Sequence, residues 1–138
     1  MREETPGTGE AVEHAVRTEH RRLEELFAEV QQALQEPGDV EDTLDTFAAL
    51  REEIEVHFDQ EDHLYYASIG ALRPDLKPEL EAFAEGHRGF RLELESIAGQ
   101  LERRDLEAVR RAFATLRSYF EQHEHAEERV IARAQQVG

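Results

Sequence analysis

The sequence predicts an all-α protein, an antiparallel up-down-up-down bundle of four helices. Helix-breaking residues fall in only a few places, and the stretches between them are rich in Glu, Arg, Ala and Leu, which favour helices. Apolar residues recur every three or four positions along those stretches, as on one face of an amphipathic helix. The chain of 138 residues is long enough for one domain with a buried core.

Proline and glycine divide the chain into four expected helices, at residues 9–36, 40–69, 76–103 and 105–136. Residues 1–9 are expected to form a disordered tail and residues 10–136 the bundle. A turn at Pro37-Gly38-Asp39 follows the first helix, and a loop between Gly70 and Pro78 follows the second. Asp39 and Asp105 are expected to cap the second and fourth helices. Short links between long helices favour antiparallel neighbours.

The composition excludes several classes of protein. Charged residues make up 35% of the chain and its formal net charge is −16, which disfavours nucleic acid as a partner because phosphates are repelled. The absence of cysteine excludes disulfides, iron–sulfur clusters and thiol catalysis. No apolar run approaches the about 20 residues that cross a membrane, and the N-terminus lacks the apolar segment of a secretory signal. We therefore expect a soluble, cytoplasmic protein that binds neither nucleic acid nor membrane.

Six hydrophilic residues interrupt the otherwise apolar helix faces: His20, His57, Glu61, His87, His123 and Glu127. Each helix contributes one histidine, and each glutamate follows a histidine by four residues, on the same face of its helix. In an antiparallel hairpin, residues at the same height are equidistant from the turn. The midpoints between successive histidines fall between Gly38 and Asp39, at residue 72 and at Asp105, all in expected links. The four imidazoles are therefore expected to lie in one layer of the bundle.

Such a buried polar layer needs a compensating partner. Burying polar groups without partners costs roughly 1–3 kcal/mol each, whereas a whole domain is stable by only about 5–15 kcal/mol. A hydrogen-bonded network of His and Glu could compensate, but metal ions compensate better, because imidazoles and carboxylates then become ligands. Four histidines and two glutamates exceed the needs of one tetrahedral zinc ion. We expect two metal ions, one held by His20 with His57 and one by His87 with His123, bridged by the two glutamates.

Mixed imidazole and carboxylate ligands with open positions favour iron, with manganese or zinc as alternatives. An iron pair in an apolar layer suits O₂, peroxide or NO as the small ligand. The aromatic residues expected to restrict water there are Phe27, Phe58, Phe83, Phe90 and Phe120. Ferritin-like di-iron sites, the competing arrangement, need a glutamate three residues before a ligand histidine. None of the seven histidines has one, which disfavours that class.

The combination of His20, His57-x-x-x-Glu61, His87 and His123-x-x-x-Glu127 resembles the hemerythrin-like, or HHE cation-binding, family over about residues 10–136. The resemblance implies a non-haem di-iron centre, with a bridging oxo or hydroxo group, in a four-helix bundle. Members of the family include O₂ carriers, O₂ and redox sensors, iron-responsive domains and proteins that affect peroxide or NO handling.

The chain departs from the oxygen-carrying members of the family at two positions. Those proteins have a further histidine four residues after the third-helix histidine, where this chain has Arg91, and an aspartate five residues after the fourth-helix histidine, which is absent here. One metal is therefore expected to lack a ligand, and the candidates to replace it are solvent, Tyr119, Tyr65 and Glu24. A more open site autoxidises more easily, which disfavours simple reversible O₂ carriage.

Residues near the six ligands carry further expectations. Asp62 and Glu128 are expected to face solvent or to hold the far nitrogen of a ligand histidine. Tyr66 is assigned to packing near a loop. Gly86 and Gly89 lie inside the third helix, where each costs about 1 kcal/mol relative to Ala, and are attributed to close helix approach or a local bulge. Three histidines outside the apolar helix faces are expected to face solvent: His14, His63 and His125.

The leading hypothesis is a hemerythrin-like di-iron protein that binds, senses or reacts with O₂, peroxide or NO in a sensing, redox or iron-dependent stress role. Two alternatives stay open at this point. The first is a weak di-iron oxidoreductase, such as a peroxidase or an NO reductase. The second is a metal-free helical interaction module. The sequence itself assigns no catalytic residue, no organic cofactor and no oligomeric state.

Overall fold

The computed structural model describes residues 9–36 and 39–136, and within these ranges the regular structure is entirely helical. The all-α class is therefore confirmed. The elements in order are α1 (Gly9–Gln35), α2 (Val40–Gln60), the π-helical turn η1 (Glu61–Tyr65), α3 (Tyr66–Leu72), the 3₁₀ turn η2 (Pro74–Leu76), α4 (Lys77–Glu102) and α5 (Leu106–Arg133).

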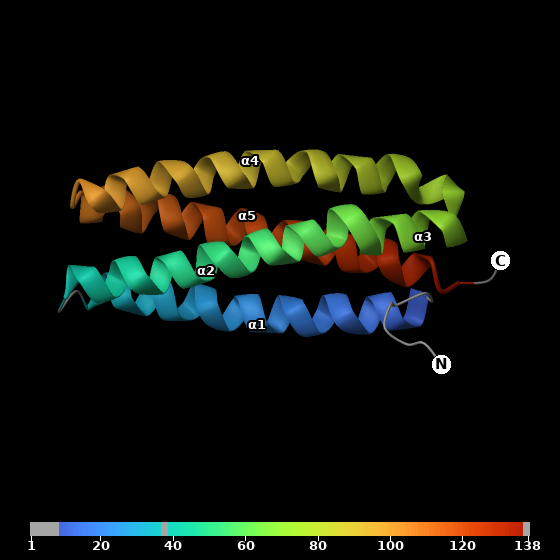
Figure 1. Cartoon of the computed structure of the whole chain (residues 1–138), viewed down its shortest axis with the longest axis horizontal. Coiled ribbons are helices and arrows are strands. Elements are labelled where there is room, and N and C mark those ends of the chain that lie inside the picture. Colours follow the sequence, from blue (N-terminus) through green and yellow to red (C-terminus); the bar gives the residue numbers. More distant parts are fainter. Residues whose placement is uncertain (1–8, 37–38, 137–138) are drawn as a thin grey trace.

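The described elements form four long rods, because α2, η1 and α3 follow one another without a break (Figure 1). The C-terminal end of α1 and the N-terminal end of α2 lie at one end of the molecule, and the link between α3 and α4 lies at the other. α1 contacts α2 and α5, and α4 also contacts α2 and α5. The apolar faces of the four rods therefore meet around a common interior, as in a helical bundle.

The helix ends follow the sequence signals closely. Asp39 caps α2 by accepting a hydrogen bond from the Glu41 backbone N–H at 3.0 Å, and Asp105 caps α5 by accepting one from Ala108 at 3.4 Å. Both expected caps are thus confirmed. The second rod runs on to Leu72, beyond the expected end at residue 69. Residues 1–8 of the expected tail, and Pro37 and Gly38 of the expected turn, lie outside the described residues.

The apolar core consists of two clusters. The larger lies toward the C-terminal end of α1 and the N-terminal end of α2, and the smaller lies toward the other end of the bundle. In α1, for example, Val16 belongs to the smaller cluster and Leu23 to the larger one, with His20 between them. In α5, Phe120 and Val130 bracket His123 and Glu127 in the same way. The six hydrophilic residues therefore lie between two apolar plugs, which keep water away from both ends of the layer.

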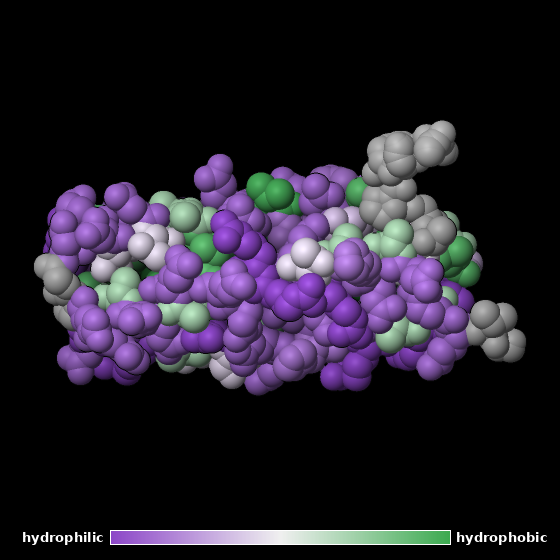
Figure 2. Space-filling view, turned by 90° about the horizontal axis from the view of Figure 1, so that it is seen from below, coloured by the Kyte–Doolittle hydropathy of each residue, from purple (hydrophilic) through white to green (hydrophobic). Residues whose placement is uncertain are grey.

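The outer surface carries most of the charge. The face shown in Figure 2 is mainly hydrophilic, and the formal net charge of the whole chain is −16. Among the described residues, none of the helices combines the length and the hydrophobicity of a membrane span.

Candidate metal centre

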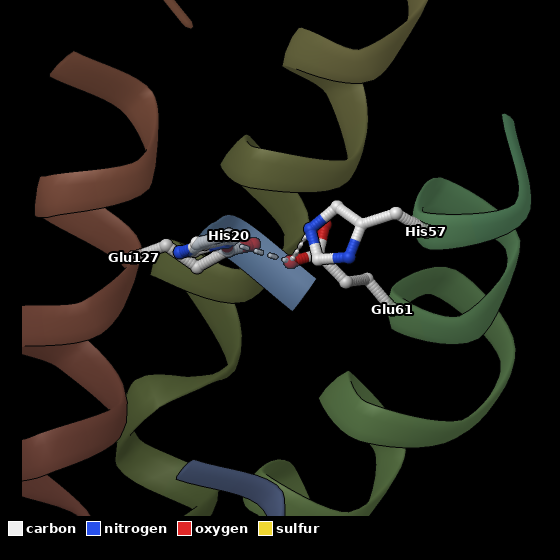
Figure 3. A group of neighbouring side chains, drawn as sticks. All are labelled: His20, His57, Glu61 and Glu127. Atoms are coloured by element: carbon white, nitrogen blue, oxygen red, sulfur yellow. Dashed lines mark hydrogen bonds and ion pairs between the residues drawn. The ribbon is translucent and has the colours of Figure 1, made fainter. Parts of the chain in front are cut away.

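All six hydrophilic residues singled out in the sequence come together in the structure. They form two groups, and in each group the four ligand atoms lie within 4.8 Å of one another. The first, which we call the His20–His57 half, comprises His20, His57, Glu61 and Glu127 (Figure 3). The second, the His87–His123 half, comprises His87, His123 and the same two glutamates. Every member is buried except His123, whose side chain is 11% exposed.

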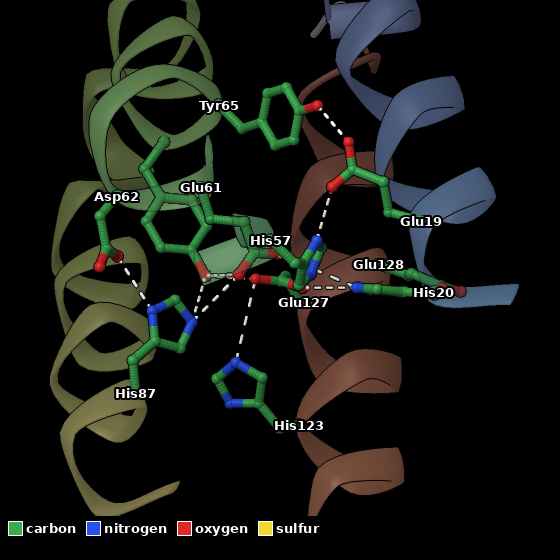
Figure 4. A network of polar contacts seen from close by, with 11 residues as sticks. Glu19, His20, His57, Glu61, Asp62, Tyr65, His87, His123, Glu127 and Glu128 are labelled. Atoms are coloured by element: carbon green, nitrogen blue, oxygen red, sulfur yellow. Dashed lines mark hydrogen bonds and ion pairs between the residues drawn. The ribbon is translucent and has the colours of Figure 1, made fainter. Parts of the chain in front are cut away.

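Each glutamate presents one carboxylate oxygen to each half. Glu61 Oε2 lies 2.9 Å from His57 Nε2, and its Oε1 lies 3.0 Å from His87 Nε2. Glu127 Oε1 lies 3.0 Å from His20 Nε2, and its Oε2 lies 3.9 Å from His123 Nε2. Figure 4 shows the carboxylates between the imidazoles. The two carboxylates thus connect the halves, as expected of bridging groups.

In three of the four imidazoles, a carboxylate contacts the Nδ1 atom, the ring nitrogen that faces away from the bridging glutamates. The pairs are His20 Nδ1 with Glu128 Oε2 at 2.7 Å, His57 Nδ1 with Glu19 Oε1 at 2.6 Å, and His87 Nδ1 with Asp62 Oδ1 at 3.0 Å. A carboxylate at Nδ1 keeps the proton there and leaves Nε2 free to bind a cation. The expectation for Asp62 and Glu128 is confirmed. Glu19 was not predicted, because its role depends on how α1 packs against α2.

The fourth imidazole, that of His123, is the exception. Within the described residues no ion pair reaches its Nδ1, and its buried Nε2 has no hydrogen-bond partner. Its ring meets the rings of Phe83 and Phe90 edge-on, each with a centroid distance of 5.3 Å. These residues line a groove of about 620 Å³ between α4 and α5, together with Gly86 and Gly89. The His87–His123 half therefore borders an apolar groove.

The glycines of α4 have a different role from the expected one. A Cβ atom at Gly86 would lie 3.6 Å from His123 Cε1, an ordinary contact, and one at Gly89 would meet nothing within 4 Å. α4 runs through both positions as a regular helix. The attribution of both glycines to close helix approach or a bulge is therefore wrong, and Gly89 leaves open space in the groove.

A π-helical turn decides which tyrosine reaches the centre. The Tyr66 N–H bonds to the Glu61 carbonyl five residues earlier, which shifts the following residues around the helix axis. The Tyr66 hydroxyl donates to Glu61 Oε1 at 3.2 Å and contacts Glu127, and it lies 3.3 Å from His87 Nε2. Its assignment to packing near a loop is therefore wrong. Tyr65 instead donates to Glu19 Oε2 at 2.5 Å, so it reaches the centre only through that carboxylate.

The other candidates for the missing ligand lie away from the centre. Tyr119 is 59% exposed, and Glu24 pairs with Arg117 at 3.1 Å on the surface. Arg91 pairs with Glu55 at 2.9 Å, so its guanidinium faces α2 rather than the centre. The remaining histidines, His14, His63 and His125, are exposed as expected.

A family model described as the hemerythrin HHE cation-binding domain matches residues 11–134. The chain belongs to this family. The match spans nearly the whole chain and includes all six residues of the centre. No curated protein and no solved structure matches the chain. The HHE cation-binding domain is named for binding metal cations, and the buried His and Glu groups of this chain are suited to hold them.

Two buried atoms of the HHE centre indicate whether its residues fit a cation. Glu61 Oε2 and His123 Nε2 lack hydrogen-bond partners, although Glu61 Oε2 lies only 2.9 Å from His57 Nε2. In each half, the four candidate ligand atoms lie within 4.8 Å of one another. Buried polar atoms without partners are unfavourable, and a bound cation would satisfy them. The imidazole and carboxylate donors therefore fit a metal ion in each half.

The electrostatics of the HHE centre differ between its halves. Burial, reinforced by the nearby His123, lowers the pKa of His87 to about 3. Burial also lowers the pKa of His123. For His20 burial acts in the same direction, but the hydrogen bond to Glu127 and the nearby carboxylate of Glu61 outweigh it and raise the pKa to about 10. Without a cation, His20 is thus protonated and the other two imidazoles are neutral.

The two glutamates of the HHE centre also differ from each other in pKa. Burial and the charge of Glu127 raise the pKa of Glu61 well above its usual value. Burial has the same tendency at Glu127, but its hydrogen bonds to His20 and Glu61 lower the pKa. Glu61 therefore holds a proton more readily than Glu127 does, as is usual for one member of a close carboxylate pair. Cation binding would have to displace that proton.

A seventh polar residue of the HHE domain, Glu124, escaped the sequence reasoning. It is only 6% exposed, and its Oε2 has no hydrogen-bond partner. Burial raises its pKa to about 8. Glu124 is buried because α5 packs against both α1 and α4, which covers a wide face of this helix. The spacing of three residues between Glu124 and Glu127 was the available signal.

Proposed function

We propose that this HHE domain is a non-haem di-iron protein that binds or reacts with O₂, peroxide or NO in a sensing, redox or iron-dependent stress role. Its framework is an antiparallel up-down-up-down bundle of four helices. The observation that carries the proposal is the position of Glu61 and Glu127, each of which presents one oxygen to each pair of histidines. A single ion would use one pair and leave the other without a partner.

The donor set supports iron as the metal. His20 and His57 would hold one ion, His87 and His123 the other, and the two glutamates would bridge them. Mixed imidazole and carboxylate donors suit iron, with manganese or zinc as alternatives. When bound, an iron pair supplies electrons and an open position for a small oxidant or for NO.

The residues around the centre position the ligands and exclude water. The carboxylates of Glu19, Asp62 and Glu128 orient three imidazoles. The Phe58 ring stacks on His87 with a centroid distance of 3.9 Å, and the apolar clusters close both ends of the layer. A small ligand bound there is shielded from bulk water, which strengthens electrostatic contacts with it.

Tyr66 favours reaction over simple storage of O₂. Its hydroxyl lies beside His87 and Glu61, in the half where oxygen carriers have a further histidine and this chain has Arg91. Burial, followed by the charges of Glu127 and Glu61, raises the pKa of Tyr66, so the hydroxyl keeps its proton in the cation-free protein. It can then donate that proton, and its oxygen would suit the vacant ligand position once the proton has left. This proton donor is the observation that favours the second candidate function, a weak peroxidase or NO reductase.

Metal analysis with a visible absorption spectrum tests the proposal. We expect two irons per chain after anaerobic loading with Fe²⁺, and charge-transfer bands after exposure to O₂ or peroxide. Steady-state turnover with peroxide or NO would favour the oxidoreductase, and stoichiometric binding would favour a sensor. A purified protein without metal, with unchanged stability after loading, would overturn the proposal and support the interaction module instead.

A further inference from the structure

Glu124 is a buried acid that the proposed centre does not use. It lies in α5 three residues before Glu127 and four before Glu128, so the three side chains share one side of the helix. Glu127 contacts His20 Nε2 at 3.0 Å, and Glu128 contacts His20 Nδ1 at 2.7 Å. Glu124 therefore lies about one helical turn along from the groups that hold His20.

A small pocket joins Glu124 to the His20–His57 half. The pocket has a volume of about 230 Å³, and both Glu124 and His20 line it. The other acids that line it already have cationic partners: Glu24 pairs with Arg117 and Glu128 with Arg17, each at 3.1 Å. Within the described residues no ion pair joins Glu124 to an arginine, and its Oε2 has no hydrogen-bond partner. Glu124 and His20 therefore border the same hollow.

A carboxylate buried without a partner is unfavourable, and a neighbouring cation would offset that cost. Two divalent cations would also carry more positive charge than Glu61 and Glu127 together neutralise. Glu124 is outside the four converging ligand atoms of the His20–His57 half, so it would reach a cation by rotating its side chain. Carboxylates change position in this way more readily than imidazoles held by a second contact.

We propose that Glu124 is a further ligand of the cation in the His20–His57 half. The inference rests on the proposed function only in requiring that this half holds a cation. It makes the two halves chemically unequal, since the first has a third carboxylate and the second has the Tyr66 hydroxyl. Neither group belongs to the pattern of four histidines and two glutamates.

The test uses Glu124→Leu and Glu124→Gln, with Glu24→Gln as the matched control from the same pocket. Thermal unfolding of the cation-free protein and anaerobic titration with Fe²⁺ are measured for each. Glu124→Leu should raise the Tm of the cation-free protein, because it removes a buried acid without a partner. The same variant should lower the affinity for one of the two cations at least tenfold. Glu124→Gln should weaken that cation less, and Glu24→Gln should change neither property.

The His87→Ala and His20→Ala backgrounds identify the half concerned. Glu124→Gln should weaken the cation that remains in His87→Ala and leave unchanged the one that remains in His20→Ala. The opposite pattern, or unchanged affinity for both cations in both Glu124 variants, overturns the inference. The proposed function still stands in that case if the wild-type protein binds two cations. Wild type that takes up no cation overturns both. If Glu124→Leu does not fold, the nearly isosteric Glu124→Gln still decides the outcome.

Discussion

The two halves of the centre offer the same types of candidate ligand and have different surroundings. In the His20–His57 half a carboxylate backs both imidazoles, and hydrogen bonds to glutamates keep His20 protonated. In the His87–His123 half both imidazoles are neutral, and His123 borders an apolar groove instead of a carboxylate. A tyrosine hydroxyl lies beside this second half. The His20–His57 half is thus rich in charge, whereas the His87–His123 half is mainly neutral and aromatic.

The difference shows what a repeated sequence pattern does and does not determine. Both hairpins end in H-x-x-x-E, and this repeat places equivalent ligands on opposite sides of the bundle. The carboxylates that contact the Nδ1 atoms of the histidines come from neighbouring elements, however, and they follow no repeat in the sequence. Glu61 begins the π-helical turn η1, whereas Glu127 lies in a regular α-helix. Equivalent ligands therefore acquire unequal electrostatic environments.

The largest expected effect comes from the residues that the halves share. Glu61→Ala and Glu127→Ala should each lose both cations, whereas His20→Ala and His87→Ala should each lose one. Each glutamate variant should also lower the free energy of unfolding of the cation-free protein by about 1–3 kcal/mol, because buried histidines lose their partners. Metal analysis and denaturant unfolding measure these changes, with Glu95→Ala on the exposed side of α4 as control. A cation retained in full by Glu127→Ala would contradict the bridging role.

The halves should respond to pH in opposite directions when no cation is bound. The pKa of His87 falls from 6.5 to about 3 on folding, so the folded state binds fewer protons in this window and loses stability as the pH falls from 6.5 toward 3. The pKa of His20 rises from 6.5 to about 10, so its contribution is present below 6.5 and is lost as the pH rises toward 10.

Single variants separate these two responses, each of which should be on the order of a few kcal/mol. His87→Leu should flatten the acid side of the curve of unfolding free energy against pH, and His20→Leu should flatten the alkaline side. Denaturant unfolding from pH 4 to pH 9, with chelator present, measures the curves. Identical curves for the two variants would remove the electrostatic difference between the halves.

The backing carboxylates should act on one half each. Glu19→Gln should weaken the cation in the His20–His57 half, and Asp62→Asn the cation in the other half, each by about 10–100-fold. The reason is that each loses the charge that orients one imidazole. Titration with Co²⁺, followed by its absorption spectrum, distinguishes the sites. Equal weakening of both cations by Asp62→Asn would show that the halves do not respond separately.

The smallest expected effect concerns the groove of the second half. Gly89→Ala should raise the free energy of unfolding by about 0.5–1 kcal/mol, because alanine favours a helix interior and its Cβ would meet nothing within 4 Å. The content of bound cation should stay the same. Thermal unfolding of the variant beside wild type measures the gain. A loss of stability would mean that Gly89 is required by packing, contrary to the open groove.

The sequence was sufficient to predict most of the fold and the core of the site. Helix propensity, apolar periodicity and the placement of proline and glycine act locally, so the helical class and the Asp39 and Asp105 caps follow from them. Equal distances from the turns then placed four histidines at one height, and the structure brings them together. Both arguments need only regular helices and short links.

The tertiary structure alone decided which residues surround the ligands. Glu19 contacts His57, and Glu124 is buried, because neighbouring helices pack against one another, which no spacing within one helix reveals. Tyr66 replaces Tyr65 because one π-helical hydrogen bond shifts the helix by a residue. Local patterns in the sequence therefore determined which types of candidate ligand come together and at what common height. Contacts between distant segments decided which charged groups and proton donors surround each half of the centre, and which half borders the groove. These properties depend on which side chains meet after packing.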